Sequence, residues 1–541
     1  MKKKKGKVLL ILAILLVLGI YYYVTIPAIN IHASGFWVSL IVILLLLLIL
    51  CMGRNLRVRS FDDLHNIREE IKESKLTRLL AGLIIVVAVV YLGGSILSSP
   101  IVNAKKYQKL LEPETGNFTE DIDQVNYNQI PLLDKDSAEL LGNRKMGSMV
   151  DMVSQFEVSS LYSQINYQGR PVRVTPLVYA SPVKWFTNQK NGIPAYISID
   201  MATQNTELVK VSQGIKYSES EYLNRNIYRH LRFRYPTYIF DQLSFEIDEE
   251  GTPYWICPVK DYTIGLFGGQ TIGRVVLCNA VTGECQSMKV EDCPSWVDRV
   301  YPADLLIQLY DYHGTLKNGF INSVLGQKGC LQTTDGYNYL AKDDDVWVYT
   351  GVTSVSGDRS NVGFVLMNQR TKETKYYEVA GAEEYSAMES AEGQVQNLGY
   401  RATFPLLLNI SNEPTYFIAL KDNAGLVKKY AMVNIQKYQN VAIGDTVSAC
   451  EKTYVKMLRS GGGSVASEAA EETITGTIKK MAQGVVDGNT HFYVVLEESD
   501  LIFDIPIVDY MEIVKYDTGD KITITYVEGD PVCTVSGLKS K

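Results

Sequence analysis

Nearly all of the long uninterrupted apolar sequence in this chain lies before Pro100, in three runs without a charged residue. Each run is near the ~20 residues needed to cross the roughly 30 Å hydrocarbon core of a bilayer. Buried helices of a soluble protein normally show a polar face, which these runs lack. The sequence therefore predicts a membrane domain over residues 1–99 with three transmembrane helices, at 8–26, 36–52 and 79–98.

The first run has an alternative interpretation as a cleaved signal peptide. Lys2 to Lys5 and Lys7 form a basic segment before it, and small residues follow at Ala33-Ser34-Gly35. The length of the run, and the second apolar run that follows shortly after it, favour a retained helix instead.

Basic residues are distributed asymmetrically around these runs. The N-terminus carries five lysines and the loop Gly53 to Arg78 carries seven basic residues, whereas Pro27 to Gly35 has no Lys or Arg. The positive-inside rule places the two basic segments in the cytoplasm. The chain is therefore predicted to be a multi-pass protein of the cell membrane, in contact with the lipid bilayer, whose C-terminal region after Ser99 is extracytoplasmic.

The predicted outer region is acidic, with 41 basic and 55 acidic residues and a net charge of −14. Binding of nucleic acid depends on cationic side chains that neutralise phosphates. A surface of this charge repels polyanions, so nucleic acid is not expected as a partner.

Seven of the eight cysteines fall in the outer region, widely spaced and odd in number. This is unlike the dense disulfide framework of a small secreted domain. Cys278, Cys285 and Cys293 are near one another in sequence, but no CxxC pair or neighbouring His completes a set of metal ligands. We predict buried small side chains with no metal site and no cofactor, and one disulfide among them stays open.

An internal repeat organises the outer region. Segments that begin at Tyr196, Val275 and Phe364 align without gaps, and a looser copy begins at Tyr430. Each of the first three opens with a largely apolar run of four residues and has a Thr at the eighth position, a Val at the sixteenth, and at the fifth position an Asp or Asn: Asp200, Asn279 and Asn368. Short polar side chains at these positions close turns on their own backbone. Each copy is therefore predicted to be a β-hairpin with these three residues in equivalent turns.

A second hairpin, marked by Gly and two Pro, precedes the repeat at 169–177 and again at 251–259. Helical stretches at 218–233, 296–310, 385–398 and 445–459 separate the hairpins. The predicted fold class is α+β, with four helix-plus-hairpin units over 136–459, joined to the membrane domain by a connector over 100–135.

The last part of the chain has a different composition. Residues 460–471 are rich in Gly and Ser and predict a flexible linker. Five strand-like runs follow within 472–541, separated by turn residues such as Thr518-Gly519-Asp520. They predict a small C-terminal β-barrel, similar to an OB or SH3 barrel.

The hairpin Arg274-Val-Val-Leu-Cys-Asn-Ala-Val-Thr-Gly-Glu284 resembles the strand and turn of PepSY-type domains. The longer stretch from about Ile130 to Asp445, which opens with Pro131-Leu-Leu-Asp-Lys-Asp-Ser137, resembles an uncharacterised family of multi-pass membrane proteins of Gram-positive bacteria. The resemblance implies a bacterial cell envelope. It supplies no activity and no catalytic residue.

Several segments were considered as sites of chemistry. A Ser or Cys nucleophile needs a positioned base, but no Gly-x-Ser-x-Gly elbow accompanies His230, His313 or His491. Gly265 to Gly273 lacks the Gly-Lys-Ser/Thr ending of a phosphate loop and predicts a wide hairpin loop. Asp343-Asp344-Asp345 lacks the spacing of an EF-hand and predicts a solvated turn. No catalytic residue is assigned, although a pair of carboxylates brought together by folding stays open.

One basic cluster suggests binding. Arg225, Arg229 and Arg232 accompany aromatic residues on or beside a predicted helix, where they bind either a partner or an acidic neighbouring unit. The leading hypothesis is a non-enzymatic, membrane-anchored scaffold or binding protein of the cell envelope, with another envelope protein or a cell-wall polymer as partner. The alternative is an envelope enzyme that acts on cell-wall glycan or peptide.

Overall fold

The structure is a computed structural model that describes residues 2–53, 75–123, 130–355, 360–460, 472–486, 489–507, 510–527 and 532–540. The chain divides into two compact units. The first consists of Met1–Ile410 and Pro414–Val441, and the second of Ser411–Glu413 and Ala442–Lys541. Residues 461–471 of the predicted linker over 460–471, and residues 54–74 of the basic loop from Gly53 to Arg78, lie outside the described residues.

Three helices open the first unit: α1 (Lys2–Thr25), α2 (Ser34–Gly53) and α4 (Lys75–Leu97). In the described part of the chain, two of them, α2 and α4, are long and apolar enough to cross a membrane. They pack on each other through Leu44, Leu80 and Val87. Most of their other side chains are not buried by protein, as expected for a surface that faces lipid.

The prediction of three transmembrane helices is wrong. The apolar part of α1 covers Ile14–Thr25. Among the described residues, α2 and α4 alone are long and apolar enough to cross a membrane.

The predicted fold class as a whole is also corrected, because the body is built mostly of strands that form several separate sheets. Its helices are short: α5 (Pro100–Gln108), α6 (Phe118–Asp121), α7 (Lys135–Gly147), α8 (Pro182–Asn188), α9 (Ile227–Arg234), α10 (Ala303–Thr315) and α11 (Glu384–Gln394). The predicted helix at 218–233 shrinks to α9 because its first turn begins only at Asn226, whose side chain accepts a hydrogen bond from Arg229 N.

Two sheets lie in the first half of the body. One has the order β2-β4-β5-β6, with β3 paired to β4: β2 (Phe156–Val158), β3 (Ser163–Tyr167), β4 (Arg170–Tyr179), β5 (Ile193–Asp200) and β6 (Thr206–Ile215). The other has the order β10-β9-β8-β7: β7 (Ser244–Ile247), β8 (Pro253–Ile264), β9 (Gly268–Asn279) and β10 (Cys285–Lys289).

Two further sheets follow. A seven-stranded sheet has the order β1-β15-β14-β13-β11, with β12 on β13 and β16 on β14: β1 (Glu114–Thr115), β11 (Leu331–Thr333), β12 (Asn338–Lys342), β13 (Asp345–Ser354), β14 (Ser360–Asn368), β15 (Thr374–Tyr377) and β16 (Gly381–Ala382). The next sheet contains β17 (Arg401–Ala402), β18 (Leu406–Ile410), β19 (Glu413–Lys421) and β20 (Val427–Asn434), and β21 (Val441–Gly444) lies where the two units meet in sequence.

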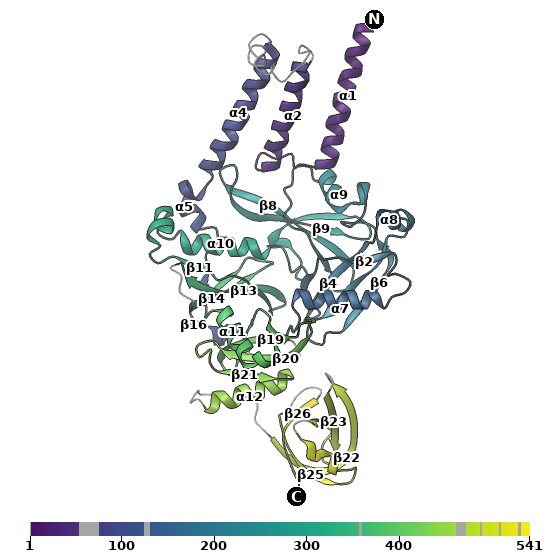
Figure 1. Cartoon of the computed structure of the whole chain (residues 1–541), viewed down its shortest axis with the longest axis vertical. Coiled ribbons are helices and arrows are strands. Elements are labelled where there is room, and N and C mark those ends of the chain that lie inside the picture. The colour runs from purple at the N-terminus through teal and green to yellow at the C-terminus, as the bar shows by residue number, and fades with distance from the viewer. Residues whose placement is uncertain are drawn as a thin grey trace. The chain divides into compact units, whose positions relative to one another are not determined.

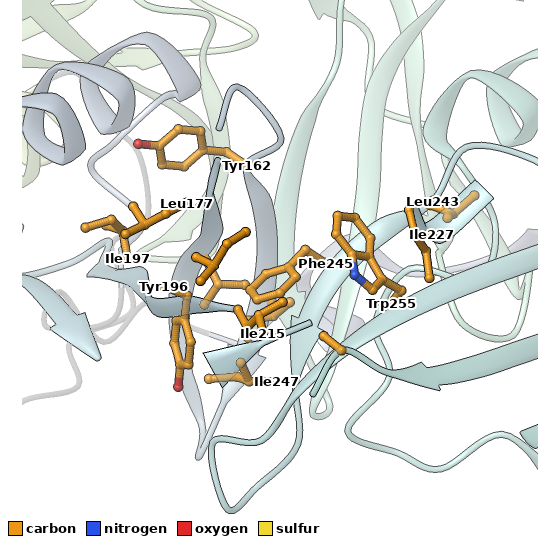
Figure 2. Packing of buried hydrophobic residues seen from close by; sticks show 14 of the residues in the cluster. Tyr162, Leu177, Tyr196, Ile197, Ile215, Ile227, Leu243, Phe245, Ile247 and Trp255 are labelled. Atoms are coloured by element: carbon orange, nitrogen blue, oxygen red, sulfur yellow. The ribbon is translucent and has the colours of Figure 1, made fainter. Parts of the chain in front are cut away.

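The β7–β10 sheet is buried on both faces. Trp255 and Cys278 belong to a core shared with the β2–β6 sheet, whereas Ile256 and Leu277, one residue along each strand, belong to a second core under α10. Figure 2 shows the first core, where Phe245 packs between Tyr196 and Trp255. Burial of both faces explains why the strands read as continuous apolar runs and not as alternating ones.

The predicted equivalence of Asp200, Asn279 and Asn368 is confirmed. Each is the last residue of its strand, and its side-chain oxygen accepts hydrogen bonds from the backbone N–H groups two and three residues later, at 2.7–3.0 Å. The Thr three residues on then accepts from a backbone N–H in its turn: Thr203, Thr282 and Thr371. The three hairpins β5–β6, β9–β10 and β14–β15 therefore share one turn.

The second unit contains α12 (Val447–Ser460) and a closed barrel with the strand order β22-β23-β24-β26-β25. The strands are β22 (Glu472–Val486), β23 (Asn489–Leu496), β24 (Ile502–Pro506), β25 (Lys521–Val527) and β26 (Val532–Ser540). Phe503, Ile522 and Cys533 are among the residues of its core. Its assignment to an OB or SH3 type stays a prediction, as do the domain boundaries.

Candidate functional site

The predicted arginine cluster lies on α9 and just before it, next to the C-terminal end of α1 (Figure 1). Arg229 Nε donates to the carbonyl oxygen of Tyr23 at 3.3 Å, and its guanidinium lies 4.9 Å from the centre of the Tyr23 ring. Arg232 Nε donates to Ile26 O at 3.0 Å. The last carbonyls of a helix lack intrahelical donors and carry partial negative charge, so a guanidinium satisfies and stabilises them.

Arg225 and Arg232 also bind the body itself. Arg225 Nη1 donates to the backbone carbonyl of Gln189, and Arg232 Nη1 donates to the carbonyl of Tyr238. Burial lowers the pKa of Arg232 from its ordinary value. The guanidinium groups therefore make contacts within the chain, but their partners are backbone carbonyls and not the acidic unit that the sequence hypothesis named. Backbone carbonyls give no signal in a sequence.

Aromatic and backbone contacts also join the body to the end of α1 and to the segment after it. The Phe233 ring packs on Tyr22 and Tyr23, with centres 6.3 and 5.9 Å apart. Ile29 N donates to Pro236 O at 2.8 Å, and Asn30 Nδ2 donates to Thr237 O at 2.9 Å. The end of α1 and the segment that follows it therefore contact the body through both side chains and backbone.

The tip of the β8–β9 hairpin makes the matching contact with α2 and α4. Ile264 pairs with Gly268, so Gly265-Leu266-Phe267 form a tight three-residue loop, shorter than the wide loop predicted. Ser98 Oγ accepts from the N–H groups of Leu266 and Phe267 at 2.8 and 3.2 Å. The Phe267 ring lies 5.2 Å from that of Tyr91 and 6.3 Å from that of Trp37.

We call these contacts the collar: Arg229, Arg232 and Phe233 on α9, with Leu266 and Phe267 at the hairpin tip. His32, whose ring nitrogen Nδ1 lies 2.8 Å from Leu266 O, completes the contact beside α2. Gly265 has φ +62°, and a Cβ there would lie 2.4 Å from Ser98 Oγ. The collar holds the β-rich body against the ends of the N-terminal helices.

A second group of side chains includes His230 of α9. His230, Cys278 and Cys285 place their ligand atoms within 4.8 Å of one another. Cys278 is the next-to-last residue of β9, and Cys285, the first residue of β10, lies directly opposite. Because Asn279 N donates to Glu284 O, the two cysteines form the adjacent non-hydrogen-bonded pair, in which side chains approach most closely. We call these three residues the thiol–imidazole cluster.

Hydrogen bonds fix the histidine within the cluster. Nε2 of His230 lies 2.7 Å from Gly283 O, and a carbonyl can only accept, so this nitrogen carries a proton. The Tyr217 ring lies against the imidazole, with centres 4.5 Å apart. Cys285 Sγ donates to the same Gly283 oxygen at 3.5 Å.

The surroundings shift the pKa values of the two thiols in opposite directions. A hydrogen bond from Cys278, followed by one from His230, lowers the pKa of Cys285 to about 5. The bond to Cys285 raises the pKa of His230 above its ordinary value. The same Cys285 contact, together with burial, raises the pKa of Cys278. The cluster thus combines two sulfur atoms and an imidazole, the ligand types that bind soft and borderline metal ions.

The remaining candidates of the sequence are structural. His313 Nδ1 lies 3.1 Å from Gln108 O, and His491 Nδ1 lies 2.7 Å from Asp504 Oδ1. Asp343 and Asp344 form the predicted turn, both with positive φ, and Asp345 pairs with Arg370.

Two carboxylates are brought together by the fold. Asp298 N donates to Glu246 Oε2 at 2.9 Å, and Asn166 N donates to Asp298 Oδ2 at 2.7 Å. Burial raises the pKa of both acids, and both residues are 0% exposed. A glycan has no access to groups buried in this way, so they form part of the core and not an active site.

Comparison with known proteins does not place the chain in a family. No family model matches it, and no curated protein matches it. Among solved structures, the GH32 beta-fructofuranosidase BmSUC1 of Bombyx mori is similar at 11% identity and a TM-score of 0.17, covering 75% of this chain and 70% of that one. A mutant of the same enzyme in complex with sucrose gives 10% identity and a TM-score of 0.19, covering 73% and 69%. Scores this low carry no argument about fold or activity.

Proposed function

We propose that the chain is a membrane-anchored, non-enzymatic scaffold or binding protein of the bacterial cell envelope. In this proposal α2 and α4 cross the membrane, and the acidic β-rich body lies on the outer side and recruits an envelope protein or a cell-wall polymer. The collar is the observation that supports it. The body is joined to α1, α2 and α4 by side-chain and backbone contacts from two separate elements, not by a flexible tether.

A scaffold benefits from such an attachment, because a fixed body presents its surface at a constant distance from the membrane. Each charge-assisted hydrogen bond from an arginine contributes about 1.5–3 kcal/mol. Arg229 and Arg232 lie on one turn of α9 and bind carbonyls at the end of α1. Changing both to Ala removes the polar half of the collar.

Topology is tested by labelling with an impermeant maleimide on intact cells. Cys51 is half-buried and the other seven cysteines are buried, so Cys51→Ser supplies a background of low reactivity. In that background Val183→Cys, at a side chain that is 68% exposed, is expected to react on intact cells. A cysteine at Arg68, in the basic loop, is expected to react only after lysis. The reverse pattern would exclude an extracytoplasmic body.

The attachment is tested by a photo-crosslinking amino acid in place of Phe267 in native membranes. Crosslinked peptides are expected to come from the segments around Trp37 and Tyr91 of the same chain. Arg229→Ala with Arg232→Ala is expected to reduce a matching crosslink from Phe233 to α1. Arg170→Ala is the control, because this arginine is exposed and pairs with Asp200, at 3.9 Å, outside the collar. Equal yields in all variants would show that the arginines do not hold the body.

The alternative, an envelope enzyme that acts on glycan or peptide, stays a prediction. It would require turnover that a single carboxylate substitution abolishes without unfolding the protein.

A further inference from the structure

We infer that His230, Cys278 and Cys285 form a binding site for a zinc ion, with three ligands from the chain and one coordination position left for solvent. The inference goes beyond the proposed scaffold function and does not depend on it. It rests on the position of three ligand atoms in one small volume of the body.

The ligand set matches the chemistry of zinc. Thiolate sulfur binds at about 2.3 Å and imidazole nitrogen at about 2.0–2.1 Å in tetrahedral sites. Ligand atoms in such a site lie roughly 3.5–4 Å apart, as follows from these bond lengths. The three atoms of the thiol–imidazole cluster are already within 4.8 Å of one another, so small rotamer changes bring them to binding distance.

The fold fixes each ligand before the metal arrives. The two cysteines are held opposite each other by the register of β9 and β10, and the turn between them is closed by the side chain of Asn279. The bond between His230 and Gly283 O sets the orientation of the ring.

The histidine is the least buried of the three ligands. Cys278 is fully buried and Cys285 is 8% exposed, whereas His230 is half-buried. Entry of an ion is therefore expected on the side of the histidine. Three protein ligands leave a position for water, as in zinc sites that are not purely structural.

The competing chemistry is a disulfide between Cys278 and Cys285, since directly opposed cysteines are also placed to oxidise. A disulfide would remove both thiolates from the site. The two outcomes differ in mass, in metal content and in their dependence on His230, because a disulfide has no need of an imidazole.

The test uses the full chain purified in detergent without chelator or reductant. About one zinc per chain is expected by elemental mass spectrometry, and replacement by Co²⁺ is expected to give the absorption band of a thiolate–cobalt bond. Cys278→Ser, Cys285→Ser and His230→Gln are each expected to lose stoichiometric zinc. The matched control is Cys293→Ser, a buried cysteine of the second core, which is expected to retain it.

Folding of the variants is checked by a second measurement. Added zinc is expected to raise the thermal midpoint of the metal-depleted wild-type chain and of Cys293→Ser, but not that of His230→Gln. A Cys278–Cys285 disulfide found by peptide mapping of the purified protein would overturn the inference. So would wild-type levels of zinc in His230→Gln. Neither result would bear on the labelling pattern that tests membrane topology.

Discussion

The β9–β10 and β14–β15 hairpins have the same turn but different surroundings. In both, an Asn closes the turn through two backbone N–H groups and a Thr accepts a third. The first residue pair beyond the turn is Cys278 and Cys285 in one hairpin and Met367 and Thr374 in the other. The turn is therefore common to both hairpins, and what each hairpin can bind depends on the residues that flank the turn.

The two hairpins are also held in different ways. Arg370, two residues after Asn368, makes two hydrogen bonds to the buried carboxylate of Asp345, at 2.6 and 2.8 Å. The equivalent residue in β9–β10 is Val281, and there His230 of α9 contacts the turn at Gly283 instead. The β14–β15 hairpin thus has an ion pair within its own sheet, whereas the β9–β10 hairpin has a contact from α9. This contact places a histidine beside the two cysteines, as a metal site requires.

The largest expected effect comes from breaking this ion pair. Arg370→Ala leaves the carboxylate of Asp345, which is 7% exposed, without its cation. Loss of one partner of a buried pair costs about 3 kcal/mol, measured as the free energy of unfolding of the full chain in micelles. Val281→Ala, at the equivalent position of β9–β10, is expected to cost less than about 1 kcal/mol. Equal losses would show that the two turns are not held differently.

A slightly smaller effect is expected from Gly283→Ala. Gly283 has φ +74°, and a Cβ there would lie 2.3–2.8 Å from three atoms of the Tyr217 ring. The left-handed conformation and the displaced ring together cost about 2–3 kcal/mol. Gly169→Ala is the matched control, because Gly169 has the same φ of +74° with nothing within 4 Å. It is expected to lose only about 1 kcal/mol, so an equal loss would exclude the contact with Tyr217 as the cause.

Replacing Asn279 or Asn368 by Ala measures how much the shared turn stabilises each hairpin. Asn279→Ala is expected to cost about 1–2 kcal/mol, because two backbone N–H groups lose their acceptor. Asn368→Ala is expected to cost more, since Asn368 Nδ2 also donates to Asp345 at 2.7 Å. Thermal and chemical unfolding of the two variants side by side measure the difference. A larger loss at Asn279 would contradict the assignment of the shared turn.

The smallest effect concerns the residue that corresponds to Gly283 in the other copies. Gln204 has φ +62° and Lys372 has φ +68°, a conformation that favours glycine. Gln204→Gly is expected to stabilise the chain by about 0.5 kcal/mol. Lys372→Gly is expected to gain less, because it removes the hydrogen bond from Lys372 Nζ to Leu110 O. A loss of stability in Gln204→Gly would show that strain in the turn is negligible.

Sequence alone determined the features that depend on neighbours in the chain. Asp200, Asn279 and Asn368 were placed correctly, because an Asx side chain bonds to N–H groups only two and three residues away. The turn at Asp343 and Asp344, both with positive φ, was also predicted, because three consecutive aspartates lack the spacing of a calcium loop. The apolar runs at α2 and α4 were recognised for a similar reason, since contact with lipid needs only length and composition.

The tertiary structure decided everything that joins distant parts of the chain. It brought His230 beside Cys278 and Cys285, which the sequence had set aside for want of a neighbouring histidine. It turned Arg229 and Arg232 towards carbonyls at and just after the end of α1. Among the described residues, it limited the membrane-crossing candidates to two helices. The physical reason is that strand register and helix packing, not sequence spacing, set which side chains meet. Backbone carbonyls, the partners of these arginines, are the same at every residue and leave no trace in a sequence.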